Sequence, residues 1–165
     1  MSNVILVDKN DNQIGLEDKV KAHLGQGILH RAFTILIFNK KNEILLQKRA
    51  KDKMLWPLVW EATCSSHPLE NKTYEEAGKK RLKQELGFSC PLKLVDKFIY
   101  QSSCGKVGAE NEVCGLLKGE YNGDVKADSQ EVAEWKWVSL LELRKEIKKN
   151  PEQYAPWLKI ALEKL

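Results

Sequence analysis

The chain has 165 residues, of which 42% are hydrophobic and 30% are charged. This length is typical of a single domain of about 100–200 residues, and the composition excludes a disordered or collagen-like protein. Lys and Arg number 27 against 23 Asp and Glu, and the resulting net charge of +4 is spread along the chain. This balance does not indicate nucleic-acid binding, whereas it suits a small anionic ligand.

The sequence shows no signal for secretion or for a membrane. The first 15 residues contain no basic segment followed by an apolar one, and no run approaches the roughly 18 apolar residues that a membrane helix needs. None of the four cysteines forms a C-x-x-C pair. We therefore expect a reduced, cytoplasmic protein without a membrane partner, in which Cys90 and Cys104 are buried. No heptad pattern or apolar edge demands a second chain, so we expect a monomer.

Apolar periodicity and turn residues predict a mixed α+β domain. The predicted strands span residues 3–7, 13–16, 31–38, 43–48, 56–62, 92–101, 110–118 and 131–138. The first four form two hairpins around short polar turns. The predicted helices span residues 17–23, 73–87, 139–148 and 152–164. Thr73 and Glu76 form a T-x-x-E capping box for the second helix, and Gly87 ends it.

Two glutamates are the first candidates for chemistry. Glu110 and Glu112 lie one residue apart on a predicted strand, so their carboxylates share a face. Because like charges repel, the pKa of one carboxyl rises unless a cation lies between them. The apolar residues 113–117 place the pair at the mouth of a core strand. The residues alone leave two interpretations equally open, a metal or catalytic site and a solvated strand face.

The chain contains only three histidines, at positions 23, 30 and 67. Imidazole is the commonest metal ligand in proteins. Three scattered histidines, however, are by themselves expected to have structural or surface roles.

The predicted helix at residues 75–88 resembles the second half of a Nudix box, the loop–helix–loop that holds divalent metals against a diphosphate. Glu85 and Gly87 match the R-E-x-x-E-E-x-G pattern, while Arg81 and Gln84 occupy two of its three glutamate positions. Lys72 stands at the upstream glutamate position. Ordinary diphosphate hydrolysis is therefore poorly supported.

Over nearly its whole length the chain resembles the type I isopentenyl-diphosphate isomerases, a branch of the Nudix superfamily. The matching blocks occur in the family's order: H-x6-H-R-A-F from His23, Q-K-R-A-x-x-K from Gln47, W-P-x-V-W from Trp56, S-H-P from Ser66, R-L-x-x-E-L-G from Arg81, Tyr100, E-N-E-V-C from Glu110 and P-W at 156–157. The resemblance implies an α+β fold, a Nudix-type mixed β-sheet sandwich flanked by helices. It also implies a single domain over residues 1–165.

The resemblance implies a roughly octahedral site for one divalent ion (zinc, manganese or magnesium), with three histidines and two glutamates as ligands: His23, His30, His67, Glu110 and Glu112. Imidazole and carboxylate suit these metals, and the ion would relieve the repulsion between the glutamates. The resemblance further implies Glu85 as the ligand of a second ion, magnesium, that arrives with the diphosphate. The residues implied to neutralise the diphosphate are Lys19, Arg49, Lys53 and Arg81.

The reaction implied is the conversion of isopentenyl diphosphate to dimethylallyl diphosphate. One proton is added to the terminal alkene carbon and another is removed from C2, through a state that resembles a tertiary carbocation. Such a reaction needs an acid, a base and an aromatic surface that stabilises positive charge. The resemblance implies Glu112 as one proton-transfer group with Tyr100 close by, and Trp157 as the aromatic cover.

The chain departs from the family at Ser65, where the family has a cysteine as its second proton-transfer group. The neighbouring Cys64 is expected to pack in the core, because adjacent side chains of a strand face opposite ways. A serine hydroxyl is far less acidic than a thiol of pKa near 8.5, and general acid–base catalysis contributes about 10²–10⁴-fold. Three functions therefore compete: a slow isomerase in which Ser65 relays a proton, a Nudix hydrolase of another diphosphate, and a prenyl-diphosphate binder without turnover.

Overall fold

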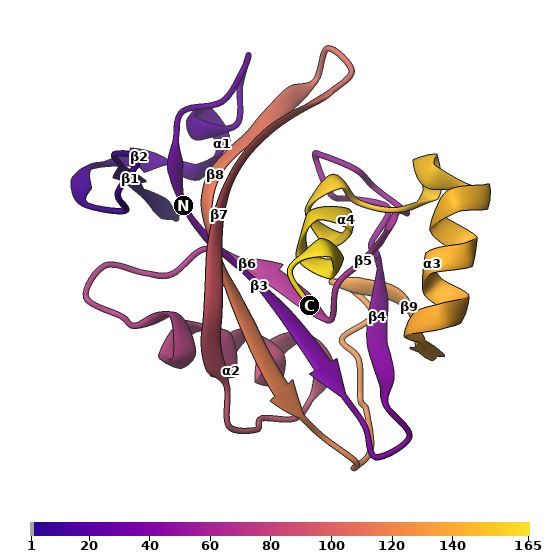
Figure 1. The fold of residues 1–165 in the computed structure, drawn as a ribbon. Coiled ribbons are helices and arrows are strands. Elements are labelled where there is room, and N and C mark those ends of the chain that lie inside the picture. The colour runs from indigo at the N-terminus through magenta and orange to yellow at the C-terminus, as the bar shows by residue number, and fades with distance from the viewer. Residues whose placement is uncertain (1) are drawn as a thin grey trace.

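A computed structural model describes residues 2–165 (Figure 1), so residue 1 of the predicted domain lies outside the described residues. The strands are β1 (Asn3–Val7), β2 (Gln13–Asp18), β3 (His30–Phe38), β4 (Glu43–Arg49), β5 (Trp60–Glu61), β6 (Cys64–Ser66), β7 (Lys93–Cys104), β8 (Gly108–Glu120) and β9 (Val132–Ser139). The helices are α1 (Lys19–Ala22), α2 (Tyr74–Leu86), α3 (Leu140–Lys149) and α4 (Pro156–Glu163), with a 3₁₀ turn at Pro151–Gln153.

The strands join into one mixed sheet around β3. This strand pairs antiparallel with β1, β4 and β6, and it pairs in parallel with β8 along its full length. The long hairpin β7–β8 curves along one side of the molecule, and β4 with β5 and β9 forms the other side (Figure 1). The predicted α+β fold is thus confirmed, with a single curled sheet as its scaffold.

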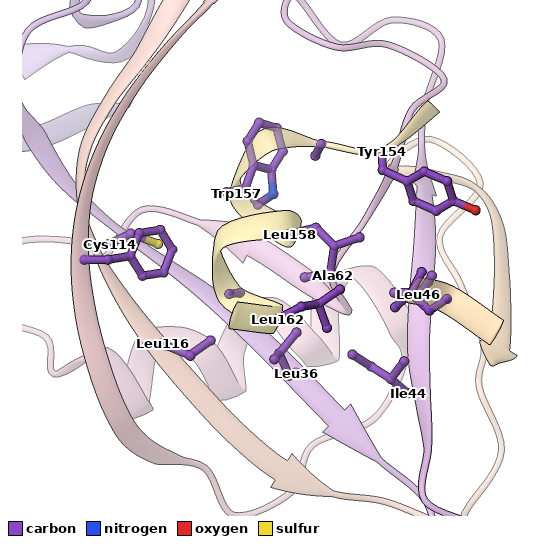
Figure 2. Packing of buried hydrophobic residues seen from close by; sticks show 14 of the residues in the cluster. Leu36, Ile44, Leu46, Ala62, Cys114, Leu116, Tyr154, Trp157, Leu158 and Leu162 are labelled. Carbon is purple, nitrogen blue, oxygen red and sulfur yellow. The ribbon is translucent and has the colours of Figure 1, made fainter. Parts of the chain in front are cut away.

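Strand β3 separates two hydrophobic layers. Leu36 and Phe38 belong to the cluster under α3 and α4, whereas Phe33, Ile35 and Ile37 belong to the cluster under α2. Figure 2 shows α4 held in the concave side of the sheet, with its apolar side chains directed at β3, β4 and β8. A strand covered on both faces needs a nearly continuous apolar run, which residues 32–38 provide.

Helix α2 follows its sequence signals closely. The Thr73 hydroxyl accepts the backbone N–H of Glu76, whose carboxylate accepts the N–H of Thr73, and Gly87 ends the helix with φ 78°. Gly78 faces the sheet, where a Cβ atom would lie 2.8 Å from a methyl carbon of Leu117. The helix therefore packs more closely on the sheet than a larger residue would permit.

Three predicted elements differ from the structure. The predicted helix 152–164 is interrupted, because Tyr154 and Ala155 are extended between the 3₁₀ turn and α4, which begins at Pro156. The predicted strand 56–62 is wrong in its first half, because Trp56 and Leu58 have positive φ values around Pro57 and form a turn; only Trp60–Glu61 is strand. The predicted helix 17–23 begins at Lys19, because residues 17–18 belong to β2 and Asp18 caps the helix. Strand β6 has only three residues and was not predicted.

Residues 31–38 and 43–48 were predicted to form a hairpin, but the two strands pair only next to the turn that joins them. Phe38 pairs with Ile44, after which β3 and β4 diverge, and β4 continues against β9.

Cys90 is buried as expected, but Cys104 is only half-buried because it lies at the end of β7, next to the hairpin turn. Within residues 2–165, no helix has the length and apolar character that crossing a membrane requires; the cytoplasmic location stays a prediction.

Candidate metal centre and active site

The register of three strands brings the first ligands together. His30, at the start of β3, pairs with Glu112 on β8, and Glu112 pairs on its other side with Tyr100 on β7. Glu110 precedes Glu112 by two residues and therefore shares its sheet face. Residues far apart in the sequence thus meet at one end of the sheet.

His23 reaches this point from α1, which it ends. The tip of the β7–β8 hairpin holds its backbone, since Ala109 N–H donates to the His23 carbonyl over 2.9 Å. A Cβ atom on Gly108 would lie 2.3 Å from that carbonyl oxygen. The close approach therefore requires glycine at position 108.

Ligand atoms of five side chains converge within 4.8 Å of one another: His23, His30, His67, Glu110 and Glu112. Nε2 of His23 lies 3.0 Å from a Glu110 oxygen, while Nε2 atoms of His30 and His67 lie 3.4 and 3.3 Å from one Glu112 oxygen. These are the five side chains that the family resemblance implies, and they form a His₃Glu₂ metal-binding group.

The donor chemistry of this group fits a cation. Nδ1 of His23 lies 2.6 Å from the Lys19 carbonyl oxygen and Nδ1 of His30 lies 2.7 Å from that of Ile28. Because a carbonyl only accepts hydrogen bonds, each Nδ1 carries a hydrogen, and in the neutral imidazole Nε2 therefore presents a lone pair to the cluster. Nε2 of His30 is fully buried without a hydrogen-bond partner. A bound divalent ion would satisfy this nitrogen.

The protonation states of Glu110 and Glu112 also favour a bound cation. Burial and repulsion from Glu112 raise the pKa of Glu110 to about 7. Burial also favours neutral Glu112, but hydrogen bonds from the Glu110 carboxyl and the Tyr100 hydroxyl oppose it, and the pKa of Glu112 falls to about 2. Burial and the nearby His30 lower the pKa of His67, which is therefore neutral. Without a cation, the two carboxyls share one proton near neutral pH.

A cavity of about 290 Å³ adjoins the metal-binding group. All of the predicted catalytic and substrate-binding residues line it: Ser65, Tyr100, Glu112, Lys19, Arg49, Lys53, Arg81 and Trp157. His30 and Glu85 do not line this cavity. One pocket therefore combines carboxylate, aromatic and basic groups.

The apolar wall of the cavity is aromatic. Trp157 is 3% exposed and packs in the core with α4 (Figure 2), yet one side of it faces the cavity. Its ring centre lies 5.3 Å from that of Trp56 and 6.5 Å from that of Tyr100. The Tyr100 hydroxyl donates to Glu112 over 2.9 Å. This wall can hold a hydrocarbon group and stabilise positive charge on it.

The cations of the cavity have carboxylate partners that the sequence reasoning missed. Arg49 donates to Glu61 over 2.8 Å, and Lys53 pairs with Glu131. Lys19 makes no ion pair among residues 2–165. Its burial and the positive charge of the nearby Lys53 both lower the pKa of the Lys19 amine. A lone carboxylate inside the apolar run W-P-L-V-W-E-A was the signal for Glu61, whereas Glu131 had none.

Glu85 lies apart from the five ligands. Its carboxylate is buried and accepts hydrogen bonds from Arg81 Nε, Gln47 Nε2 and the Cys64 thiol, at 3.0, 3.1 and 3.1 Å. Its role as a magnesium ligand stays a prediction. Cys64 packs under α2 as expected, but its thiol also donates to Glu85.

Ser65 faces the opposite way from Cys64. Its hydroxyl lines the cavity and lies 3.1 Å from the Thr34 hydroxyl. The two side chains therefore alternate across the strand as expected, and Cys64 does not line the cavity.

The chain matches known proteins over most of its length. The family model described as "NUDIX domain" matches residues 28–159. Isopentenyl-diphosphate Delta-isomerase 2 of Aromatoleum aromaticum is 37% identical over 162 residues, which cover 98% of this chain and 85% of the relative. Isopentenyl-diphosphate Delta-isomerase 2 of Photorhabdus laumondii is 40% identical over 156 residues, 94% of this chain and 88% of the relative.

Solved structures show the same fold. DR0079 from Deinococcus radiodurans superposes with a TM-score of 0.78 over 97% of both chains, at 13% identity. A MutT protein from Methanosarcina mazei gives 0.64 over 82% of this chain and 91% of its own, at 18% identity. The fold, the five-ligand group and the identity to relatives agree: the chain belongs to the isopentenyl-diphosphate Delta-isomerase family of the Nudix superfamily.

Proposed function

We propose that the chain isomerises isopentenyl diphosphate to dimethylallyl diphosphate. The observation that carries the proposal is the placement of the His₃Glu₂ group beside a cavity that Ser65, Tyr100 and Trp157 also line. Every residue of this site comes from one chain, so the proposed active unit is a monomer consisting of a single domain.

The His₃Glu₂ group would hold one divalent ion, and zinc, manganese and magnesium all accept such ligands. When bound, the ion supplies positive charge that keeps both carboxylates ionised. Glu85 is proposed to hold a second ion, magnesium, together with oxygen atoms of the diphosphate. Since Arg81 donates to the Glu85 carboxylate, this arginine must share it with that ion.

Two proton-transfer groups are proposed, on the strands that flank β3. Glu112, oriented by the Tyr100 hydroxyl, lies on β8, and Ser65 lies on β6. One group gives a proton to the terminal carbon of the alkene and the other takes a proton from C2, so the net proton count is unchanged. Trp157 faces the positive charge that develops on the hydrocarbon between these two events.

The diphosphate is proposed to contact the four cations of the cavity wall, Lys19, Arg49, Lys53 and Arg81. Glu131 pairs with two of them, Lys53 and Arg81, so a bound diphosphate must compete with this partly exposed carboxylate. Lys19 has no such carboxylate partner among the described residues, so it is proposed as the first residue that the diphosphate contacts.

The test is proton and phosphorus NMR of isopentenyl diphosphate with the protein and magnesium in deuterated water. We expect dimethylallyl diphosphate to form with deuterium at C2 or C4, and Glu112→Gln to abolish this. Glu134→Gln, which removes an exposed carboxylate on β9, serves as the matched control. Release of phosphate would show a hydrolase, and an unchanged substrate would contradict the isomerase proposal.

A further inference from the structure

Glu61 is a buried carboxylate that the proposed reaction does not yet use. It lies on β5, is 2% exposed, and sits behind the cavity wall. One of its oxygens accepts Arg49 Nη1 at 2.8 Å and the other accepts the Trp157 indole N–H at 3.1 Å. A buried charge is retained at a cost unless it is paired and hydrogen-bonded, and both of these partners line the cavity.

The two donors come from different elements. Arg49 ends β4, whereas Trp157 lies in the first turn of α4. The guanidinium carbon of Arg49 lies 5.3 Å from the centre of the Trp157 ring, so the two side chains pack on each other and share one carboxylate.

We propose that Glu61 is a positioning residue of this site: its one carboxylate orients the Trp157 indole and the Arg49 guanidinium. This inference rests on the proposed function and deepens it. Because one carboxylate fixes both groups, the aromatic cover and a cation that contacts the diphosphate keep one relative geometry, which positions the hydrocarbon for proton transfer.

Glu61→Gln tests this directly. The amide keeps the size of the side chain and one carbonyl oxygen, but its nitrogen donates hydrogen bonds and cannot accept them. The amide oxygen can accept from only one of the two donors, Arg49 and Trp157, and the amide nitrogen faces the other as a second donor. We expect kcat for the isomerisation to fall about 10²-fold because the indole is misplaced, with a smaller change in KM.

A double-mutant cycle separates positioning from a merely structural role. If Glu61 acts through Trp157, then Glu61→Gln in the Trp157→Phe background lowers kcat by less than about twofold further. Independent losses that multiply would overturn the inference. Glu134→Gln is the control, since it removes a carboxylate from the same chain outside the cavity.

A second measurement does not depend on turnover. The chain has five tryptophans, and Trp157→Phe identifies the indole N–H signal of Trp157 in a ¹⁵N spectrum. We expect Glu61→Gln to shift this signal and to speed its exchange with solvent. Should Glu61→Gln not fold, Glu61→Asp replaces it in both experiments, because it keeps the charge that Arg49 needs while withdrawing the carboxylate.

The outcomes are distinguishable. An unmoved Trp157 signal in a folded variant overturns the inference even if the wild type is a fully active isomerase. A wild type without isomerase activity contradicts the proposed function, and the indole signal then decides alone whether Glu61 holds Trp157.

Discussion

His30 and Glu112 stand in register across the parallel strands β3 and β8, with Nε2 of the histidine 3.4 Å from a carboxylate oxygen. A shift of the pairing by one residue would turn one of them to the other sheet face. The metal-binding group therefore depends on long-range strand pairing as much as on ligand identity. Since Nε2 of His30 is buried without a partner, stability should depend on the ion.

Removal of divalent metal is expected to destabilise the protein. A ligand at about 100 times its Kd stabilises the folded state by about 2.7 kcal/mol, and a chelator withdraws this contribution. Calorimetry should show a lower Tm with chelator and recovery on addition of zinc, manganese or magnesium. His23→Ala should make Tm insensitive to chelator. An identical Tm of the wild type with and without chelator would contradict the metal site.

The metal-free protein is expected to carry a pH dependence from Glu110. Its pKa is about 7 in the folded state against 4.5 ordinarily, so the folded chain holds a proton that the unfolded chain releases. The contribution of Glu110 to stability is therefore fully present below about pH 4.5 and is lost as pH rises to about 7.

Neighbouring groups also titrate in this range, so a matched variant is needed. The lowered pKa of His67 has the opposite effect, since the unfolded chain then binds the extra proton below pH 6.5. Glu110→Gln isolates the carboxyl. The Tm of the chelated wild type minus that of Glu110→Gln should decrease between pH 4.5 and 7; a constant difference would contradict the assignment.

Ser65→Cys is expected to accelerate isomerisation. A thiol of pKa near 8.5 exchanges protons near neutral pH far more readily than a hydroxyl, so kcat should rise about 10²-fold or more. The deuterium-NMR assay measures it, and Ser103→Cys, on the exposed β7–β8 hairpin, controls for an added thiol. An unchanged kcat would show that Ser65 takes no part in the rate-limiting proton transfer.

Gly108→Ala is expected to weaken metal binding without touching a ligand. Its Cβ atom would lie 2.3 Å from the His23 carbonyl oxygen, so the hairpin or α1 must move. Elemental analysis should find less bound metal. Gly15→Ala is the matched control, because its Cβ meets only a Leu6 methyl carbon at 3.8 Å. Full metal content in Gly108→Ala would mean that the hairpin does not hold His23.

Local signals made some elements predictable. The Thr73 capping box and Gly87 bound α2 in the structure as they do in the sequence, because the hydrogen bonds involved join residues three or four apart. The opposite orientations of Cys64 and Ser65 were predictable for the same reason, since strand side chains alternate with period two. The turn at Trp56–Leu58 was not predictable. The apolar residues there are typical of a strand, whereas the positive φ values of Trp56 and Leu58 are incompatible with one.

The sequence by itself determined the residue types available as ligands and, through the resemblance of its motifs, the family and the five expected ligands; the three histidines and the glutamate pair taken alone left their roles open. Only the tertiary structure decided how they meet. The parallel β3–β8 register, the contact of Gly108 with His23 and the bonds of Glu61 to Arg49 and Trp157 all join residues distant in the chain. Such pairings depend on packing between elements, and no local pattern of residues encodes them.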